Sequence, residues 1–280
     1  NIGIVLIALV GFRWLQGTFA GVSIKDELDN KDNFAFGLSV AGGITALCLI
    51  LGAAVSGDAS VSLIHEVVNV TVFAAAGIVL LKIGMIVTDK LMLNKVSVPE
   101  QLRNRNIAVG IVNAANLVAL GLIIRATVDW IETDSWTGVG VVVWIFLVAL
   151  IITLLVTQLR SYIYGRRHNG ASWQQALADG NSALAVRYAG NILATAIAVS
   201  AVSGLVNYLP AEPWLSVMYW AGFSVAMVAL VWVLYRMTVP ILLKGIDIKE
   251  EVDNQQNLGV AFIEFAIFIG LASIVSFWMV

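Results

Sequence analysis

The sequence predicts an all-α integral membrane protein of about eight transmembrane helices, arranged as four two-helix repeats that share one orientation. Three observations predict this fold. Of the 280 residues, 60% are hydrophobic and only 12% are charged, whereas a soluble domain has roughly 25% charged residues. The apolar residues form separate runs of the length that crosses a bilayer, roughly 20 residues. A short polar signature recurs four times between these runs.

Eight apolar runs are long enough to span a membrane. They are residues 2–22, 34–56, 66–88, 106–128, 139–159, 181–205, 217–240 and 257–280. Backbone in lipid must form helices or a closed barrel, and no alternating strand pattern competes with the helical interpretation. We therefore expect eight helices in two domains, residues 1–133 and 134–280, each with two helix hairpins.

The linkers between these runs differ in charge, which predicts the orientation. Those that follow the odd-numbered runs are 23–33, 89–105, 160–180 and 241–256, and they hold eleven Lys and Arg residues. The other linkers, 57–65, 129–138 and 206–216, hold none. The positive-inside rule places the basic linkers in the cytoplasm and both ends of the sequence outside. Indole rings anchor at membrane interfaces, and four tryptophans lie at the predicted outer side. These are Trp130, Trp136, Trp214 and Trp220.

The recurring signature is a Glu or Gln that precedes an Asn by six residues. The four pairs are Glu27 and Asn33, Glu100 and Asn106, Gln175 and Asn181, and Glu251 and Asn257. Successive Asn residues are 73, 75 and 76 positions apart, so each repeat contains two spans and one basic linker. Two crossings return the chain to its starting side, so all four hairpins insert alike, with a symmetry axis along the membrane normal. The hairpins could surround a central axis or pair as two halves.

This pattern resembles the family of domain of unknown function 350, the YjfL-like bacterial inner-membrane proteins. Members of that family carry a short acidic linker, then Asn and a small residue, then an Ala/Gly-rich helix. The matching residues are Glu27, Asn33, Ala35 and Gly37; Glu100, Asn106, Ala108 and Gly110; Asn181, Ala183 and Gly190; Glu251, Asn257 and Gly259. The third repeat departs in having Gln175, and the fourth in having Gly259 where Ala is usual. The resemblance covers the chain as two tandem copies. It implies a bacterial inner-membrane location and no particular activity.

The four signature pairs are the first candidate site. If the repeats surround an axis, three carboxylates and four amides would meet at a cytoplasmic mouth, where acidic rings attract cations. The alternative is local structure. Ser97 with Glu100 and Ser172 with Gln175 fit capping boxes, Ser23 with Asp26 and Asp247 with Glu250 fit similar caps, and a repeated amide often bonds a neighbouring helix.

Polar residues inside the spans are the second candidate site. They are Lys82, Asn113, Asn116, Arg187, Asn191 and Glu264. Glu264 lies seven residues after Asn257, on the same helix face, and Asn113 and Tyr188 hold that position in the second and third repeats. Ionisable groups in hydrocarbon usually face the bundle interior or water. Glu264 could line an ion or proton path, or pair structurally with Lys82 or Arg187.

The sequence gives little support to catalysis. His65 and Glu66 begin a stretch that resembles a zinc-protease helix, but Asn69 replaces the second histidine. No phosphate-binding loop, nucleotide fingerprint or nucleophile elbow is present, and no linker exceeds about 20 residues. We expect no enzyme, no catalytic residue, no metal, no cofactor and no nucleic-acid partner.

Two functions remain as hypotheses, and the first is preferred. The protein could be a channel or a transporter-like protein for a small ion. Alternatively, it could be a membrane anchor or scaffold for a cytoplasmic or envelope-stress assembly, binding a protein partner through linkers 89–105 and 160–180. Basic residues there could also dock anionic lipid. Small-residue helix faces are consistent with a homo-oligomer.

Overall fold

The computed structural model describes residues 23–56, 63–131 and 137–278 of the chain, and these residues are helical apart from short turns. Within them, seven helices are long and apolar enough to span a membrane. They are α2 (Phe34–Ser56), α3 (Leu63–Val87), α5 (Ile107–Trp130), α6 (Thr137–Arg167), α8 (Ser182–Ser200), α9 (Pro213–Leu242) and α10 (Leu258–Trp278). They correspond to the second to eighth predicted spans, which confirms an all-α membrane protein. The first predicted span, 2–22, and Trp136 lie outside the described residues.

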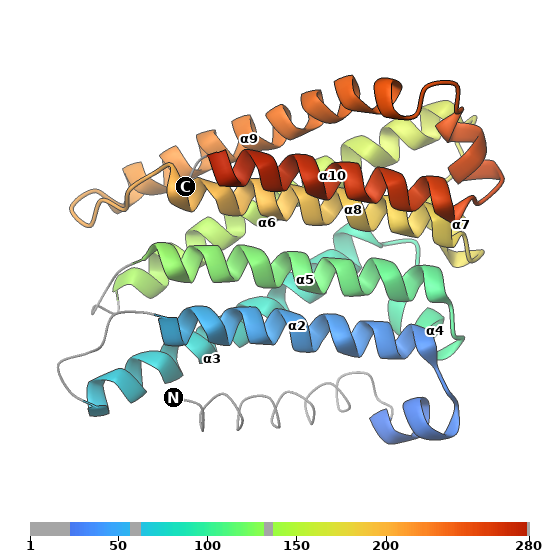
Figure 1. Cartoon of the computed structure of the whole chain (residues 1–280). Coiled ribbons are helices and arrows are strands. Elements are labelled where there is room, and N and C mark those ends of the chain that lie inside the picture. The colour runs from blue at the N-terminus through green and yellow to red at the C-terminus, as the bar shows by residue number, and fades with distance from the viewer. Residues whose placement is uncertain (1–22, 57–62, 132–136, 279–280) are drawn as a thin grey trace.

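Short helical segments occupy the basic linkers. Before the four signature Asn residues lie η1 (Asp26–Asn30), α4 (Val98–Arg103), α7 (Trp173–Ala178) and η4 (Lys249–Asn254). Two further segments, η2 (Thr88–Met92) and η3 (Ala201–Gly204), continue α3 and α8. The linkers that hold η1, α4, α7 and η4 gather at one end of the molecule, on the right in Figure 1. We call this the linker end. Its position shows that the described repeats share one orientation.

The second helices of the four repeats form a row. Helices α2, α5, α8 and α10 lie side by side in chain order (Figure 1). The first helices of the later repeats form a second layer over the grooves of this row. Helix α3 contacts α2 and α5, α6 contacts α5 and α8, and α9 contacts α8 and α10. The described parts of the repeats therefore follow one another in a line, which does not match the arrangement around a central axis.

Glycines allow the helices of the row to approach one another closely. A Cβ at Gly42 would lie 2.6 Å from Ala114 Cα, and a Cβ at Gly110 would lie 2.7 Å from the Ala35 carbonyl oxygen. Small residues let helix backbones meet in membranes, where packing rather than hydrophobicity drives association. The backbones of α2 and α5 therefore lie in direct contact.

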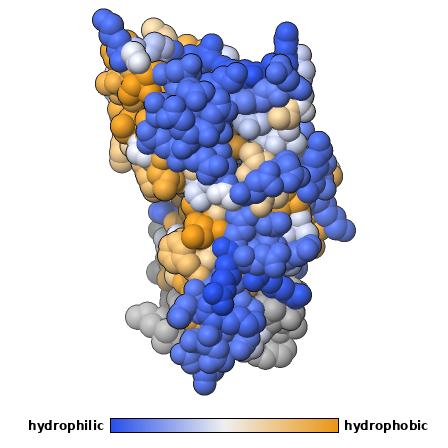
Figure 2. Space-filling model, turned by 90° about the vertical axis from the view of Figure 1, so that its right-hand side faces the viewer, coloured by the Kyte–Doolittle hydropathy of each residue, from blue (hydrophilic) through white to orange (hydrophobic). Residues whose placement is uncertain are grey.

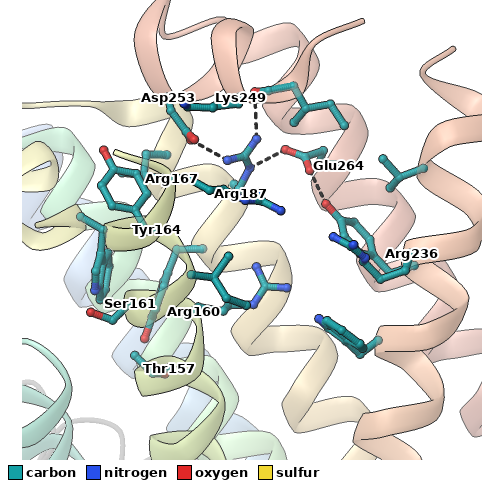
Figure 3. Close-up of a pocket in the computed structure, with 18 of the residues that line it drawn as sticks. Thr157, Arg160, Ser161, Tyr164, Arg167, Arg187, Arg236, Lys249, Asp253 and Glu264 are labelled. Carbon is teal, nitrogen blue, oxygen red and sulfur yellow. Dashed lines mark hydrogen bonds and ion pairs between the residues drawn. The ribbon is translucent and has the colours of Figure 1, made fainter. Parts of the chain in front are cut away.

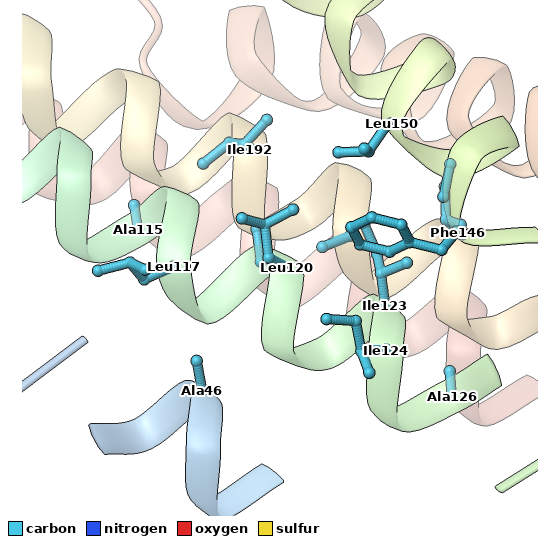
Figure 4. Packing of buried hydrophobic residues seen from close by; sticks show 14 of the residues in the cluster. Ala46, Ala115, Leu117, Leu120, Ile123, Ile124, Ala126, Phe146, Leu150 and Ile192 are labelled. Carbon is cyan, nitrogen blue, oxygen red and sulfur yellow. The ribbon is translucent and has the colours of Figure 1, made fainter. Parts of the chain in front are cut away.

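Helix α5 lies at the centre of the main hydrophobic core (Figure 4). Leu120, Ile123 and Ile124 on α5 are at most 5% exposed. Ala46 from α2 and Phe146 from α6 pack into the same core. Helix α5 is covered by α2, α8 and the second layer, and its buried Asn113 and Asn116 form hydrogen bonds with neighbouring helices.

The tryptophan prediction is wrong for two of the residues that the structure describes. Trp130 and Trp220 lie at the expected end but are buried, with ring centroids 4.7 Å apart in an edge-to-face contact. The Trp130 indole donates a hydrogen bond to the Val206 carbonyl oxygen. Trp214 is 61% exposed and remains placed for an interfacial role. The buried pair instead joins α5 to α9 inside the protein.

Candidate functional site

Each signature Asn caps the helix that it precedes. Its Oδ1 accepts a hydrogen bond from the backbone N–H three residues later, at distances of 2.9–3.3 Å. The accepting residues are Asn33, Asn106, Asn181 and Asn257. The residue immediately before each Asn has a positive φ, which turns the chain sharply from the linker into the helix. These are Asp32, Arg105, Gly180 and Gln256.

In the first three repeats, the other end of the Asn side chain joins one repeat to the next. Asn33 Nδ2 donates to the Leu102 carbonyl oxygen at 2.8 Å, and Asn181 Nδ2 donates to that of Asp253 at 3.1 Å. Asn106 Nδ2 donates to the Leu177 and Ala178 carbonyl oxygens at 3.0 and 2.9 Å. In all three cases an acceptor lies four residues before the next signature Asn. In these three repeats the amide bonds a neighbouring helical segment, as the local-structure alternative predicts, whereas the Asn257 amide donates to Glu251 of its own linker.

The paired Glu or Gln residues do not share one role. Glu27 is buried and accepts from Asn33 at 2.8 Å and from Lys31 at 2.9 Å. Glu251 accepts from Asn257 at 2.7 Å. In the second repeat the Asn106 amide donates to Gln101 instead of Glu100, and in the third Gln175 donates to Asp179. The four signature pairs thus lie one after another along the row, and their carboxylates and amides do not converge on a common mouth.

The predicted capping boxes are partly wrong. Neither Ser97 nor Ser172 makes a side-chain cap hydrogen bond, although each is the residue before its helix. Pro99 in the first turn of α4 donates no backbone hydrogen bond, which reduces the need for a side-chain cap. The other two expected caps are present. Ser23 Oγ accepts from the Asp26 N–H, and Asp247 accepts from the N–H groups of Lys249 and Glu250.

Polar side chains inside the spans connect neighbouring helices of the row. Asn113 donates to Ser39 Oγ at 2.7 Å, which joins α5 to α2. Tyr188 donates to Asn116 at 3.0 Å, which joins α8 to α5. The Arg187 Nε donates to Glu264 at 2.5 Å, which joins α8 to α10. Asn113, Tyr188 and Glu264 each lie seven residues after their signature Asn, so one repeat position makes all three connections.

The last connection is part of a buried ion cluster. Arg187 also donates to Asp253 at 2.5 Å and to the Ile248 carbonyl oxygen at 3.1 Å (Figure 3). The Glu264 side chain, 1% exposed, additionally accepts from the Tyr235 hydroxyl on α9. Burial raises the pKa of the Asp253 carboxyl, and Arg187 opposes this shift. Of the two predicted partners for Glu264, the structure selects Arg187. Lys82 lies on α3, where it interacts electrostatically with Asp89.

A pocket of about 390 Å³ adjoins this cluster. Its walls come from α6, α8, α9, α10 and η4, all in the third and fourth repeats. Its charged lining residues are Arg160, Arg167, Arg187, Arg236, Lys249, Asp253 and Glu264. Five of these are cationic and two are anionic. We call this hollow the arginine pocket.

Arg160 differs from Arg187 in its surroundings. The two pocket carboxylates are engaged by Arg187, and Asp253 also lies 3.3 Å from His168 Nε2. The Arg160 guanidinium instead lies 4.8 Å from the centre of the Phe268 ring. A ring face stabilises a cation by up to roughly 2 kcal/mol but does not neutralise it. Figure 3 shows Arg160 and Arg236 pointing into the space between α6 and α9.

Sequence reasoning identified Arg187 and Glu264 but missed most of the pocket. Arg160 was assigned to a linker because the apolar run ends at residue 159, whereas α6 continues as one helix to Arg167. Asp253 and Lys249 were treated as parts of the signature linker. Arg187 lies six residues after Asn181, and Asp253 lies four residues before Asn257. Because Asn181 bonds the Asp253 carbonyl oxygen, Arg187 on the next turn of α8 also comes within reach of Asp253.

Comparison with known families agrees with this repeat structure. The family model described as Domain of Unknown Function (DUF350) matches residues 2–128 and again residues 132–279. The chain belongs to this family. It contains two tandem copies, and each copy corresponds to two of the four repeats. Searches of curated proteins and of solved structures gave no match. The family description names no activity, and the multi-span membrane character rests on the seven apolar helices.

Proposed function

We propose that this DUF350 protein is transporter-like for a small ion, and that the ion is an anion bound in the arginine pocket. The single observation that carries the proposal is the charge of the pocket, five cationic side chains against two carboxylates. Arg187 already pairs with both carboxylates. Of the remaining cations, Arg167, Arg236 and Lys249 are exposed and Arg160 is part-buried. An anion would balance Arg160, whose charge is costly away from water without compensation.

The position of the pocket supports access from the linker end. Arg187 is five residues into α8, or about 8 Å from the start of the helix at 1.5 Å per residue. The linker residues Ile248, Lys249 and Asp253 form its rim. The basic linkers predict that this end faces the cytoplasm, and the resemblance predicts the bacterial inner membrane. An anion would then enter from the cytoplasm.

Flux measurements in liposomes test the proposal. Purified protein reconstituted with a gradient of inorganic phosphate or chloride should carry one of these anions across the membrane. Arg160→Gln should lower the rate about tenfold, which corresponds to about 1.4 kcal/mol. Glu264→Gln should also change the rate, because it releases Arg187 from one of its carboxylates.

Arg125→Gln is the matched control. Arg125 lies on α5 at the opposite end of the molecule, is 53% exposed in its side chain and pairs with Asp129 at 3.3 Å. The control should carry the anion at the wild-type rate. Absence of flux under every gradient, or equal loss in Arg125→Gln and Arg160→Gln, would refute the proposal.

A scaffold function is the second candidate, and the surface of the linker end favours it. Figure 2 views the molecule from this end and shows mainly hydrophilic residues over the linkers. Exposed basic side chains there belong to linkers 89–105 and 160–180. They include Lys95, Arg103, Arg105, Arg166 and Arg167. A stoichiometric cytoplasmic partner that is lost from purified complexes on changing Arg166 and Arg167 together would support this function.

A further inference from the structure

A second hollow continues from the arginine pocket into the membrane-spanning part of the protein. It has a volume of about 290 Å³ and lies between α6 and α9, with α8 beneath it. The two hollows share three lining residues. These are Arg160, Ile163 and Trp232. They are therefore adjacent, and Arg160 stands at the junction between them.

The chemistry of the lining changes abruptly at this junction. Beyond Arg160 the walls are almost entirely apolar. They include Leu155, Val156, Ala194, Ala198, Val225 and Val228. Asn191 and Thr195 are the neutral polar residues of this lining, and the Thr195 hydroxyl already donates to the Asn191 carbonyl oxygen at 2.8 Å. Small side chains at Ala194, Ala198 and Ala229 leave the space open. We call this second hollow the apolar groove.

The joined hollows have the length and the access that a lipid chain requires. From Leu184 in the arginine pocket to Ala198 in the apolar groove, α8 advances fourteen residues. At 1.5 Å per residue this is about 21 Å, compared with a hydrocarbon core of about 30 Å. Residues that line the groove, such as Leu155 and Val225, are 62% and 57% exposed. In a bilayer, these exposed apolar edges would face lipid.

From this arrangement we infer that the joined hollows bind a lipid with an anionic headgroup. One acyl chain lies in the apolar groove, and the headgroup phosphate lies in the arginine pocket beside Arg160. The inference rests on the proposed function, because both require an anion at Arg160. It adds that the anionic group is the phosphate of a lipid headgroup, which is attached covalently to an apolar acyl chain. A free inorganic anion would need the arginine pocket but would gain nothing from the apolar groove beyond it.

Native mass spectrometry of the full-length protein in detergent tests this inference. Phosphatidylglycerol serves as the anionic probe and phosphatidylcholine as the zwitterionic probe. One phosphatidylglycerol molecule should remain bound, at least tenfold more tightly than phosphatidylcholine. Arg160→Gln should remove this preference.

A pair of substitutions on α9 separates the groove from the anion site. Ala229 is exposed and lines the groove, so Ala229→Trp should fill it without disturbing the core and reduce phosphatidylglycerol binding at least tenfold. Ala226 is also exposed on α9 but does not line the groove, so Ala226→Trp should bind as wild type does. Binding of inorganic phosphate, measured by calorimetry, should be unchanged in both variants.

Each result has a defined meaning. If Ala229→Trp binds phosphatidylglycerol as well as Ala226→Trp does, or if phosphatidylcholine binds equally tightly, the lipid inference is wrong. In that case, Arg160-dependent binding of inorganic phosphate would leave the proposed function intact. If neither phosphate nor phosphatidylglycerol depends on Arg160, both the lipid inference and the proposed function are wrong.

Discussion

At the residue scale, the signature Asn residues act through both ends of one side chain. The Oδ1 atom caps a transmembrane helix, and in the first three repeats the Nδ2 atom bonds a backbone carbonyl of the next repeat. Asn suits this task because its amide offers an acceptor and two donors. Asp would retain the cap and lose the donor, and Ser would do the same without adding charge.

Substitution by Ser separates these two contributions. Asn106→Ser keeps a good N-cap but removes the donor to Leu177 and Ala178, so it should lower the free energy of unfolding by about 1 kcal/mol. Asn257→Ser should cost less, since Asn257 is exposed and its amide donates to Glu251 of its own linker. Thermal unfolding in detergent measures both. An equal loss in the two variants would mean that the Asn106 bond between repeats contributes nothing.

Glu27 gives the first signature pair a dependence on pH. Hydrogen bonds from Lys31 and then Asn33 hold the pKa of the Glu27 carboxyl below its usual value of 4.5. A carboxyl with a lowered pKa stabilises the folded state above its usual pKa, and this contribution is lost as the pH falls through the lowered value.

A comparison of unfolding at pH 7 and pH 3 tests this effect. The wild type should lose more stability over this range than Glu27→Gln, which has no carboxyl to protonate at this position. Glu27→Gln should also be less stable than wild type at pH 7, because it loses the ion pair with Lys31 at 2.9 Å. Identical pH dependence in the two proteins would show that the Glu27 pair does not stabilise the fold.

The candidate site was only partly predictable at this scale. Glu264 and Arg187 were recognisable because ionisable residues are rare within apolar runs. Arg160 was not, since it lies one residue beyond an apolar run and the sequence gives no sign that α6 continues to Arg167. Tyr235 also has no distinguishing pattern. Its role depends on α9 lying against α8 and α10, which is a tertiary feature.

At the element scale, apolar length and composition predicted the described spans to within a few residues at most ends. The prediction was least accurate where a helix extends beyond the hydrocarbon, as α6 does by eight residues past the predicted end at 159. Amphipathic helix continuations carry no apolar signal, so run length alone cannot detect them. Small residues such as Gly42 and Gly110 pack between helices of the same chain, and nothing in the sequence identifies their partners.

Gly110 tests the packing of α5 against α2. An added Cβ would lie 2.7 Å from the Ala35 carbonyl oxygen and 2.9 Å from its Cα, and backbone cannot move aside easily. Gly110→Ala should therefore destabilise the protein by about 1–3 kcal/mol, the usual cost of overpacking. Thermal unfolding again provides the measurement.

Gly52→Ala is the control for this prediction. Gly52 lies on α2, and no atom lies within 4 Å of the position of its added Cβ. Alanine favours helix over glycine by roughly 0.5–1 kcal/mol, so the control should be neutral or slightly stabilised. Equal stability of the Gly110→Ala and Gly52→Ala variants would contradict close packing of α5 on α2.

At the scale of the whole molecule, the repeat predicted like-oriented hairpins but not their arrangement in a row. Two crossings per repeat fix the orientation of every hairpin, because the chain returns to the same side. The rotation from one repeat to the next depends on side-chain contacts, such as Asn113 with Ser39 and Tyr188 with Asn116. These pairs are 74 and 72 residues apart. Nothing in the spacing of the signatures distinguishes such contacts from those of a ring.

The row also explains why the candidate site lies in one half of the molecule. The polar contacts between neighbouring row helices are neutral in the first repeats, where Asn113 bonds Ser39 and Tyr188 bonds Asn116. Between the last two row helices the contact is an ion pair of Arg187 with Glu264. The arginine pocket forms beside this ion pair, where α6 and α9 cover the last two row helices. The proposed anion site therefore depends on the third and fourth repeats having the same orientation, which the repeat pattern predicts for all four.

Labelling of single cysteines in intact cells tests this shared orientation most directly. In a Cys48→Ser background, one cysteine is introduced in each linker by Asp29→Cys, Glu100→Cys, Gln175→Cys or Glu250→Cys. All four positions are exposed in the structure. We predict that a membrane-impermeant thiol reagent labels none of the four in intact cells and all four in inside-out vesicles, because all four lie on the cytoplasmic face. Labelling of any one of them from the opposite face would contradict four hairpins of like orientation.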